Sequence, residues 1–543
     1  MILTCRNPIL GGFYPDPSIC RVGSDFYLVN STFAYFPGIP IFHSRDLRHW
    51  TQIGNAIHRP GQLCFDGHRI SEGLFAPTLR HNKGTFYILC TLIRTGGNFI
   101  ITAQDPAGPW SDPVWLSGAD GIDPSIFFDD DGKVWYTGTH PAPEGEAYPG
   151  NYEIYIREMD LSLLAEKKNP LIGESIGIWR GALRNAIWPE GPHLYRINNS
   201  YYLIHAEGGT SRDHAVCAAR AQNIRGPWEG KPGNPVVTHR YLEKNAAIVN
   251  VGHADMTDDP EGNWWMVLLA SRPFQGVCPL GRETFMVPVF WEDGWPFIAS
   301  KTGLVEEEFP LPYTPHDTVN INRTPESSCD HFTVSRNDDG GTMTPDALKL
   351  PLHWLILRMP ASEQDAALSL TARHGALRLF TKAAVMRGKD HPAFAGRRLR
   401  HKNWTFSAAI EFNPRTDSES AGIILLQSED WQYRFEIFLH NSGFSALRII
   451  RAAGKEDELV ISAPLTETPL VLAVRCEEMA LSFFYGKDQY SLKHLYSPLD
   501  ARILSAEYSG GFVGTLAGIF ASGNGKDTDN YADILWAEYQ GLD

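Results

Sequence analysis

Several features that mark other classes of protein are missing from this sequence. The eight cysteines are scattered, with no C-x-x-C pair and no metal-type spacing, which argues against a disulfide framework or a zinc-finger-like site. The longest apolar runs, such as 264–270, are far shorter than the ~20 residues that a membrane-spanning helix needs. The formal charge is −15, and the basic cluster at 396–404 is too short to follow a phosphate backbone. We therefore expect no membrane partner and no nucleic-acid partner.

The N-terminus also lacks the charged region and apolar region of a secretory signal. Together with cysteines that suit reduced, buried thiols, this predicts a cytoplasmic protein. A chain of 543 residues with 43% hydrophobic content is long enough for two domains, each with its own core.

A turn followed by an aromatic pair and a β-rich run occurs five times in the N-terminal half. Each copy has Gly, Asn or Asp where a hairpin turn needs it, and then residues that favour a strand. The copies are VGSDFYLVN, NKGTFYILC, DDGKVWYTG, INNSYYLIH and PEGNWWMVL. Their second aromatic residues stand 49 to 66 residues apart, which is enough chain for several strands. Five such units predict a five-bladed β-propeller.

Acidic residues stand upstream of three of these hairpins in similar settings. They are Asp16 in YPDPS, Asp123 in GIDPS and Glu190 in WPEGP, and Ala76 and His253 take the corresponding positions in the other two copies. The first strand of each propeller blade lines the central channel, so we expect these residues to converge at one mouth. The alternative is that each acidic residue only stabilises a turn. Because clustered like charges are costly without a function, we favour a site.

Carboxylates facing a sugar-sized gap suit glycoside hydrolysis, in which one donates a proton and the other acts on the opposite face of the ring. Glu190 follows Trp188 and Pro189 in a dry local sequence, and burial beside other negative charges would raise its pKa as a general acid requires. Asp16, between two prolines, suits a base that holds a water molecule. Asp123 would orient Glu190 and raise its pKa.

Longer stretches then carry a resemblance to a known family. They are NPILGGFYPDPSICRVGSDFYLVNSTF, GIDPSIFFDDDGKVWY, WPEGPHLY, VGHADM and LGRETFMVPVFWEDGWP. On these stretches the chain resembles glycoside hydrolase family 43, in particular its two-domain β-xylosidases and α-L-arabinofuranosidases. The resemblance implies a five-bladed propeller and an inverting mechanism, with Asp16 as general base, Asp123 as pKa modulator and Glu190 as general acid. The acid and base of an inverting site lie about 6.5 to 9.5 Å apart.

The resemblance implies roles for four further residues. Arg272 in ASRPF matches an arginine that binds sugar hydroxyls, with an ion pair as the alternative. Phe33 matches the aromatic wall of the −1 sugar site, and Phe75 stands where the family commonly has tryptophan; an ordinary core aromatic is the alternative for Phe33. His253 in GHADM matches a channel histidine that contacts a central calcium ion or a water cluster, with a satisfied core histidine as the alternative. The chemistry itself needs no cofactor, since the carboxylates supply acid and base.

The fivefold pattern stops after a proline-bearing connection at 307–320, and short alternating strands follow. Many short strands with turn signals predict a β-sandwich, and the resemblance points to a concanavalin-like or jelly-roll-like one. We place the domains at 1–315 and 316–543. The glycines around Phe512 in YSGGFVGT suit a loop that reaches over the active site, with a plain hairpin as the alternative.

These observations predict an all-β inverting exo-glycoside hydrolase that releases xylose from the non-reducing end of short β-1,4-xylooligosaccharides. One alternative is an α-L-arabinofuranosidase, or a bifunctional enzyme, on the same site. Another is a non-catalytic sugar-binding propeller, against which the intact set of three carboxylates argues. The fructan-cleaving invertases use an N-D-P-N-type motif that YPDPS does not match. The resemblance also implies that the chain can form homo-oligomers.

Overall fold

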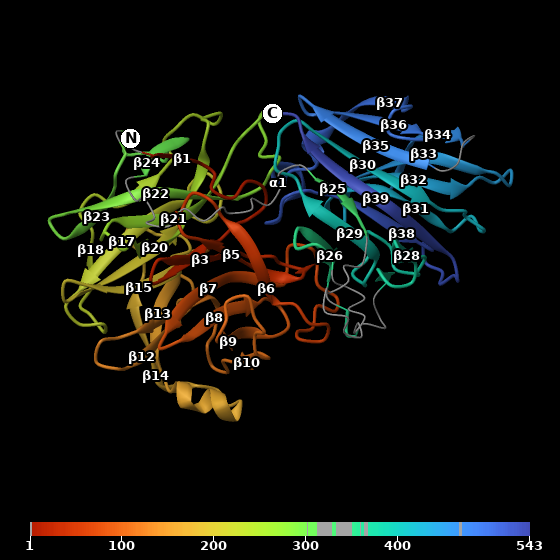
Figure 1. Ribbon diagram of the computed structural model, residues 1–543. Coiled ribbons are helices and arrows are strands. Elements are labelled where there is room, and N and C mark those ends of the chain that lie inside the picture. Colours follow the sequence, from red (N-terminus) through yellow and green to blue (C-terminus); the bar gives the residue numbers. More distant parts are fainter. Residues whose placement is uncertain are drawn as a thin grey trace.

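The computed structural model describes residues 3–300, 302–311, 328–332, 350–358, 360–362, 367–465 and 470–543. These residues form two all-β bodies, one from the N-terminal half and one from the C-terminal half (Figure 1). Helices in the described part are limited to η1 (Leu161–Glu166), η3 (Ala501–Ile503) and α1 (Ala506–Ser509). None of these short helices could cross a bilayer.

The N-terminal body consists of five antiparallel sheets that follow one another along the chain, each starting from an inner strand. The predicted aromatic pairs lie on the second strand of each sheet, after a tight turn. The first sheet, or blade, contains β2 (Ser18–Val22), β3 (Asp25–Val29), β5 (Gly38–Ser44) and β6 (Thr51–Ile57), and the second contains β7 (Leu74–Asn82), β8 (Thr85–Leu92), β9 (Gly97–Ala103) and β10 (Val114–Trp115). The third contains β11 (Ile122–Phe128), β12 (Val134–Pro141), β13 (Tyr152–Met159) and β14 (Leu171–Trp179), and the fourth contains β15 (Glu190–Ile197), β16 (Ser200–Glu207), β17 (Ala215–Ala221), β18 (Glu229–Gly230) and β19 (Val237–Thr238). The fifth contains β20 (Val249–Asp258), β21 (Trp264–Ser271), β22 (Glu283–Glu292) and β23 (Trp295–Ile298).

The inner strands close into a ring. Strand β2 contacts β7, β7 contacts β11, β11 contacts β15, β15 contacts β20, and β20 returns to β2. This closed order confirms the five-bladed β-propeller. The N-terminal and C-terminal segments of the propeller domain also pair with each other, as strands β1 (Leu3–Arg6) and β24 (Glu308–Leu311).

The C-terminal body consists of two eight-stranded antiparallel sheets, which confirms the predicted sandwich. Large apolar residues of both sheets, such as Phe406, Phe435 and Leu472, are fully buried between them. One sheet contains β25 (Ser328–His331), β27 (Leu368–Ser369), β28 (Leu377–Phe380), β30 (Trp404–Glu411), β35 (Leu470–Glu477), β36 (Ala480–Gly486), β37 (Lys493–Asp500) and β39 (Tyr531–Gly541). The other contains β4 (Tyr35–Phe36), β26 (Trp354–Leu357), β29 (Ala393–Arg398), β31 (Ser420–Ser428), β32 (Trp431–Leu439), β33 (Ser445–Ala453), β34 (Glu458–Pro464) and β38 (Leu516–Ser522).

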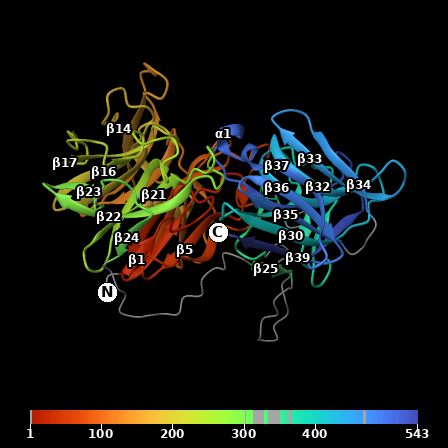
Figure 2. The same cartoon turned by 90° about the horizontal axis from the view of Figure 1, so that it is seen from above.

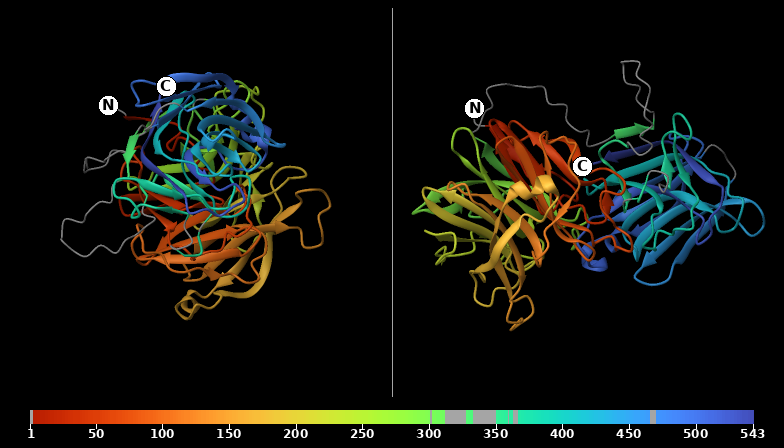
Figure 3. Two further views of the ribbon diagram at one scale, coloured as in Figure 1. Left: turned by 90° about the vertical axis from the view of Figure 1, so that its right-hand side faces the viewer. Right: turned by 90° about the horizontal axis from the view of Figure 1, so that it is seen from below.

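The two bodies share a sheet as well as a surface. Strand β4 belongs to the first blade in sequence, but it pairs with β26 and so extends a sheet of the sandwich. Viewed from above, the bodies lie side by side with α1 near their boundary (Figure 2). The view from below places the red strands of the first blade next to the sandwich (Figure 3). The predicted domain boundary between 315 and 316 lies outside the described residues.

Buried polar contacts reinforce this boundary. Arg358 is fully buried; its Nε donates to the carbonyl oxygen of His68 at 2.7 Å and its Nη2 to Glu429 Oε1 at 2.8 Å. The same Glu429 oxygen accepts the Ile70 N–H at 2.8 Å. Because a buried carboxylate is stable only when paired and hydrogen-bonded, these contacts fix the connection between the first and second blades against the sandwich.

Candidate active site

Each inner strand has a residue with a positive φ angle at or near its start, toward one end of the channel. These residues are Asp16 (52°), Ala76 (39°), Asp123 (55°), Gly191 (57°) and His253 (50°). Each stands two residues before the point where regular pairing of the inner strand starts, and in the last four blades a register shift marks the place. Non-glycine residues seldom adopt this conformation, which is strained by about 1–2 kcal/mol per residue. The chain therefore repeats a strained strand start around the channel.

This register corrects one detail of the sequence interpretation. The residue of the fourth blade that corresponds to Asp16 and Asp123 is Gly191, and Glu190 stands one residue before it. Glu190 still joins the ring, because the Gly191 N–H donates to Asp123 Oδ2 at 2.9 Å. The Gly191 backbone also contacts the fifth blade, since a Cβ there would lie 3.0 Å from His253 Cε1. The structure thus brings the predicted carboxylates and His253 to one mouth.

Asp16 is buried and fully engaged on both carboxylate oxygens. Ser31 Oγ donates to Oδ2 at 2.6 Å, and Arg282 Nη1 donates to Oδ1 at 2.9 Å. The Ser31 hydroxyl itself accepts the Ala76 N–H at 2.7 Å, so the second blade orients it. The position of the Asp16 carboxylate is therefore set by three separate segments.

The three carboxyl groups have contrasting acidity. Burial acts to raise the pKa of Asp16, but the charges of Arg282 and His253 outweigh it and hold this pKa below its usual value. Burial raises the pKa of Asp123 as well. The pKa of Glu190 is raised well above its usual value by burial, followed by the negative charges of Asp123 and Asp16. The pKa values of two carboxyl groups of the mouth are thus shifted in opposite directions, as a base and an acid require.

The arginine of the site is Arg282, whereas the sequence interpretation singled out Arg272. Arg272 forms a bidentate ion pair with the buried Glu283, at 2.8 and 2.9 Å, which is the alternative that the sequence interpretation left open. Arg282 Nη1 contacts Asp16 and also donates to Thr210 Oγ1 at 2.9 Å. Its Nε is buried and has no hydrogen-bond partner among the described residues, and such a donor can be satisfied by a bound molecule.

Three phenylalanines from both domains form an aromatic wall beside these groups. Phe33 and Phe512 stack with ring centroids 6.1 Å apart, and Phe75 meets them edge-on at 4.9 and 5.8 Å. The Arg282 guanidinium lies 5.7 Å from the centroids of both Phe33 and Phe512. Phe512, on the loop after α1, is tied to the propeller because its N–H donates to Ser71 Oγ at 3.0 Å. The sandwich loop therefore reaches the propeller, and Phe33, Phe75 and Phe512 lie together beside Arg282.

The acidic residue nearest to His253 along its own strand is not a free ligand for the calcium ion that the resemblance allowed. Calcium prefers a shell of several oxygen ligands. The nearest acidic residue along β20, Asp255, already accepts hydrogen bonds from Arg80 on both oxygens, at 2.7 and 2.9 Å, and from Ser18 at 2.6 Å. A guanidinium of the chain itself thus balances the Asp255 charge, and we assign no step to a metal.

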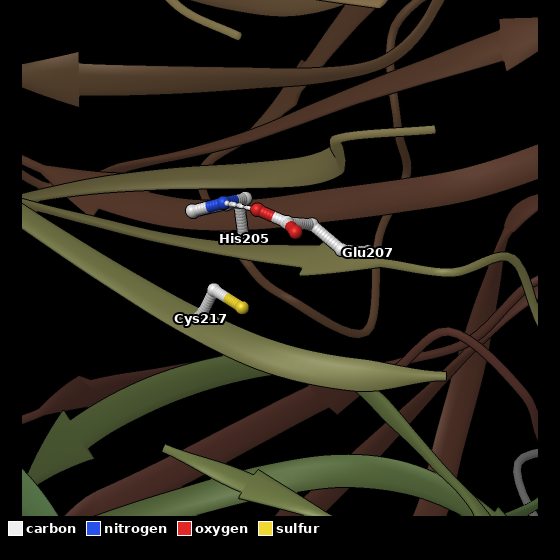
Figure 4. A group of neighbouring side chains, drawn as sticks. All are labelled: His205, Glu207 and Cys217. Atoms are coloured by element: carbon white, nitrogen blue, oxygen red, sulfur yellow. Dashed lines mark hydrogen bonds and ion pairs between the residues drawn. The ribbon is translucent and has the colours of Figure 1, made fainter. Parts of the chain in front are cut away.

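A second group of ligand-type side chains lies within the fourth blade, on the strands next to the one that carries Glu190. His205 Nε2 and Glu207 Oε1 are 2.8 Å apart on β16, and Cys217 faces them from β17 (Figure 4). Glu207 also accepts the backbone N–H groups of Ala182 and Leu183. Burial raises the pKa of Cys217 well above its usual value, so the thiol stays neutral. This group anchors the segment that leads to Glu190.

Sequence reasoning missed Ser31, Thr210 and Arg282, and also His214. His214 Nδ1 contacts the Asn250 carbonyl oxygen at 3.1 Å, and its buried Nε2 has no partner among the described residues. Burial lowers the pKa of His214 to about 3, so the ring is neutral. Ser31 stands in NSTF, Thr210 and His214 in AEGGTSRDHAV, and Arg282 in LGRETF, but the spacing in these stretches gave no reason to select one polar side chain over another.

Comparison with known proteins agrees with this arrangement. Residues 5–296 match the family model "Glycosyl hydrolases family 43", and residues 346–540 match "Beta xylosidase C-terminal Concanavalin A-like domain". A xylosidase/arabinosidase from Butyrivibrio fibrisolvens is 41% identical over 98% of this chain and 99% of its own. A non-reducing end α-L-arabinofuranosidase from Bacteroides ovatus is 36% identical, over 99% and 95%.

Solved structures give the same result over the full length. A xylan β-1,4-xylosidase from Bacillus halodurans superposes with a TM-score of 0.87 at 30% identity, covering 99% of this chain and all of its own. A Bacteroides ovatus protein from a xyloglucan utilisation locus, GH43B, also gives a TM-score of 0.87, at 35% identity over 99% and 100% of the two chains. With the propeller, the sandwich and the three carboxyl groups in place, the chain belongs to glycosyl hydrolases family 43 and is a glycoside hydrolase.

Proposed function

We propose that the protein removes single xylose units from the non-reducing end of short β-1,4-xylooligosaccharides, with inversion at the anomeric carbon. One observation carries the proposal: within one mouth the pKa of Asp16 is lowered and that of Glu190 is raised. Opposite shifts of this kind separate a base from an acid.

The proposed reaction is a single displacement. Glu190 gives its proton to the glycosidic oxygen as the bond from that oxygen to the anomeric carbon breaks. A water molecule attacks the same carbon from the opposite face, and Asp16 accepts a proton from that water. The products are xylose of inverted configuration and the shortened oligosaccharide. Asp16 then loses its proton to solvent, and Glu190 takes up a proton from solvent.

Asp123 and Arg282 support these roles without exchanging protons. The Asp123 charge raises the pKa of Glu190, and its bond to the Gly191 N–H fixes the backbone next to Glu190. Arg282 keeps Asp16 ionised, and its unpaired Nε is a donor for a sugar hydroxyl. The wall of Phe33, Phe75 and Phe512 offers apolar surface to the bound pentose.

The names of the relatives support a pentose substrate, and one of them favours a second candidate. The relative from Bacteroides ovatus is named for α-L-arabinofuranose release, and that from Butyrivibrio fibrisolvens for both sugars. Xylose and arabinofuranose present similar hydroxyls, which a single pocket separates only modestly. Arabinofuranosidase activity on the same site is therefore our second proposal. A cytoplasmic location and a homo-oligomeric state stay predictions from the sequence.

The test is hydrolysis of 4-nitrophenyl β-D-xylopyranoside and 4-nitrophenyl α-L-arabinofuranoside by the wild type, Asp16→Asn and Glu190→Gln. We expect the wild type to cleave at least one substrate, and both variants to lose at least about 100-fold in kcat while keeping the wild-type thermal unfolding. NMR of the first sugar released should show the inverted anomer. Retained configuration, or full activity in either variant, would refute the mechanism; the faster substrate decides between the two sugars.

A further inference from the structure

Trp188, which the mechanism leaves unused, is a large aromatic side chain held in an unusual conformation two residues before Glu190. Its φ angle is 49°, in the left-handed region that bulky residues rarely adopt. Its side chain is 40% exposed. Strain in the backbone persists only where the surroundings enforce it, and such residues cluster at functional sites.

The surroundings of Trp188 enforce this conformation. The Trp188 N–H donates to the Gly150 carbonyl oxygen at 2.7 Å. Two glycines leave room for the indole: a Cβ on Gly209 would lie 2.8 Å from Cε3, and a Cβ on Gly150 would lie 3.0 Å from Cε2 and Nε1. The next carbonyl, that of Pro189, accepts the Thr139 hydroxyl at 2.6 Å. The indole is thus fixed in place while much of its surface stays open to solvent.

The same contacts place the indole on the rim of the active site. Gly209 precedes Thr210, which accepts a hydrogen bond from Arg282. On the other side of the indole, Tyr152 stands two residues after Gly150. The pKa of Tyr152 is raised by burial and then by neighbouring carboxylates that include Glu190, so Tyr152 lies near the acid of the site. Both segments that pack against Trp188 therefore continue into the site.

Trp188 and the phenylalanine wall are linked to different carboxyl groups of the site. Phe33 and Phe512 lie beside Arg282, which binds Asp16, whereas Trp188 is joined through Pro189 to Glu190. In the proposed reaction Glu190 faces the departing part of the substrate. A flat, rigid aromatic surface on that side suits the apolar face of a pyranose ring and costs little conformational entropy to use.

We propose that Trp188 is the aromatic platform of the leaving-group subsite, on which the sugar that departs from the cleaved bond stacks. This inference rests on the proposed function of Glu190. Trp188 would then favour oligosaccharides over substrates with small leaving groups. The ligand of the subsite is a pyranose unit.

The experiment compares a substrate that fills this subsite with one that does not. Xylobiose places a xylose unit there, whereas in β-D-xylopyranosyl fluoride the leaving group is a single fluoride ion. We expect Trp188→Ala to lower kcat/KM for xylobiose at least tenfold and to change that for the fluoride less than twofold. Trp188→Phe, which keeps an aromatic face, should retain at least a third of the xylobiose activity. If the wild type prefers arabinofuranosides, an arabinofuranosyl-xylobiose, which again places a xylose unit there, and α-L-arabinofuranosyl fluoride replace the pair.

Trp115→Ala is the matched control, since Trp115 is 39% exposed and lies on the outermost strand β10 of the second blade. It should leave both rates within twofold of the wild type. Equal losses on both substrates in Trp188→Ala and Trp188→Phe would mean that Trp188 only supports the fold around Glu190, and unchanged xylobiose hydrolysis would mean that no sugar stacks on it. Either result overturns the platform. A wild type that cleaves neither substrate would refute the proposed function instead, and the platform with it.

Discussion

Ser31 Oγ donates to Asp16 Oδ2 at 2.6 Å, one of the shortest side-chain hydrogen bonds of the site. Both residues are buried, and the same hydroxyl accepts the Ala76 N–H from the next blade. A hydroxyl that accepts a backbone hydrogen bond in this way has its own proton directed at the carboxylate. Ser31 thus both orients Asp16 and stabilises its ionised form.

Ser31→Ala should therefore move the acid side of the pH profile. Loss of the donor raises the pKa of Asp16, and because the base must be ionised, activity will be lost at a higher pH than in the wild type. We also expect kcat/KM at the optimum to fall about tenfold, as for loss of a hydrogen bond to a charged group. Ser44→Ala is a suitable control, since Ser44 is equally buried but bonds to Asp46. An unchanged acid limb would contradict this role.

Asp123→Asn should act on the opposite side of the profile. The Asp123 charge raises the pKa of Glu190, and the acid is active only while protonated, so activity is lost as pH rises through that pKa. Removing the charge lowers the pKa, and the basic limb of kcat/KM should move to lower pH. Asp129→Asn, just beyond the far end of the same inner strand, should leave the limb in place. If the basic limb of kcat/KM were unchanged in Asp123→Asn, Asp123 would not raise the pKa of Glu190.

The two arginines of the fifth blade should respond differently to the same substitution. Arg282→Met removes the hydrogen bonds from Nη1 to Asp16 and Thr210 and should lower kcat/KM at least about 100-fold. Arg272→Met leaves the buried Glu283 without its partner and should cost about 3–5 kcal/mol of stability. Kinetics and urea unfolding of both variants measure this contrast. If folded Arg272→Met lost as much kcat/KM as Arg282→Met, Arg272 would have to contact the sugar as well.

Phe512→Ala should affect substrate binding more than stability. The ring is 40% exposed, so its removal leaves no large cavity, but it takes away one side of the phenylalanine wall. We expect KM for the nitrophenyl substrate to rise about tenfold and the unfolding temperature to change by no more than about 2 °C. Phe444→Ala, which truncates a ring of similar exposure on the sandwich, should change neither. A wild-type KM in Phe512→Ala would argue that the wall does not contact the sugar.

The repeat of hairpins was visible in the sequence because turns and aromatic pairs recur at a regular distance, and that repeat was enough to predict the propeller and the meeting of Asp16, Asp123 and Glu190. The one-residue displacement of Glu190 was not visible, because it depends on where the strand pairing shifts. Arg272 and Arg282 could not be separated either. One follows β21 and the other precedes β22 at the same end of the blade, and only the packed structure shows that Glu283 takes Arg272.

Contacts between distant parts of the chain were equally beyond reach. Ser31 binds a residue fifteen positions away, but nothing in the local pattern selects it from the neighbouring Asn30 and Thr32. Phe512 could be proposed from its glycine-rich loop, yet its contact with Phe33 arises only when the sandwich packs on the first blade. Pairing of this kind depends on tertiary packing rather than on residue type.

The strand shared by the two bodies also sets the order in which the enzyme can be completed during synthesis. Tyr35 and Phe36 are made early, but their partner strand β26 follows more than three hundred residues later, and Phe512 later still. The N-terminal part of a chain generally folds first as it emerges from the ribosome. The carboxyl groups can thus be assembled well before the wall beside them is finished, so a chain that ends prematurely carries the acid and base without a complete place for the sugar.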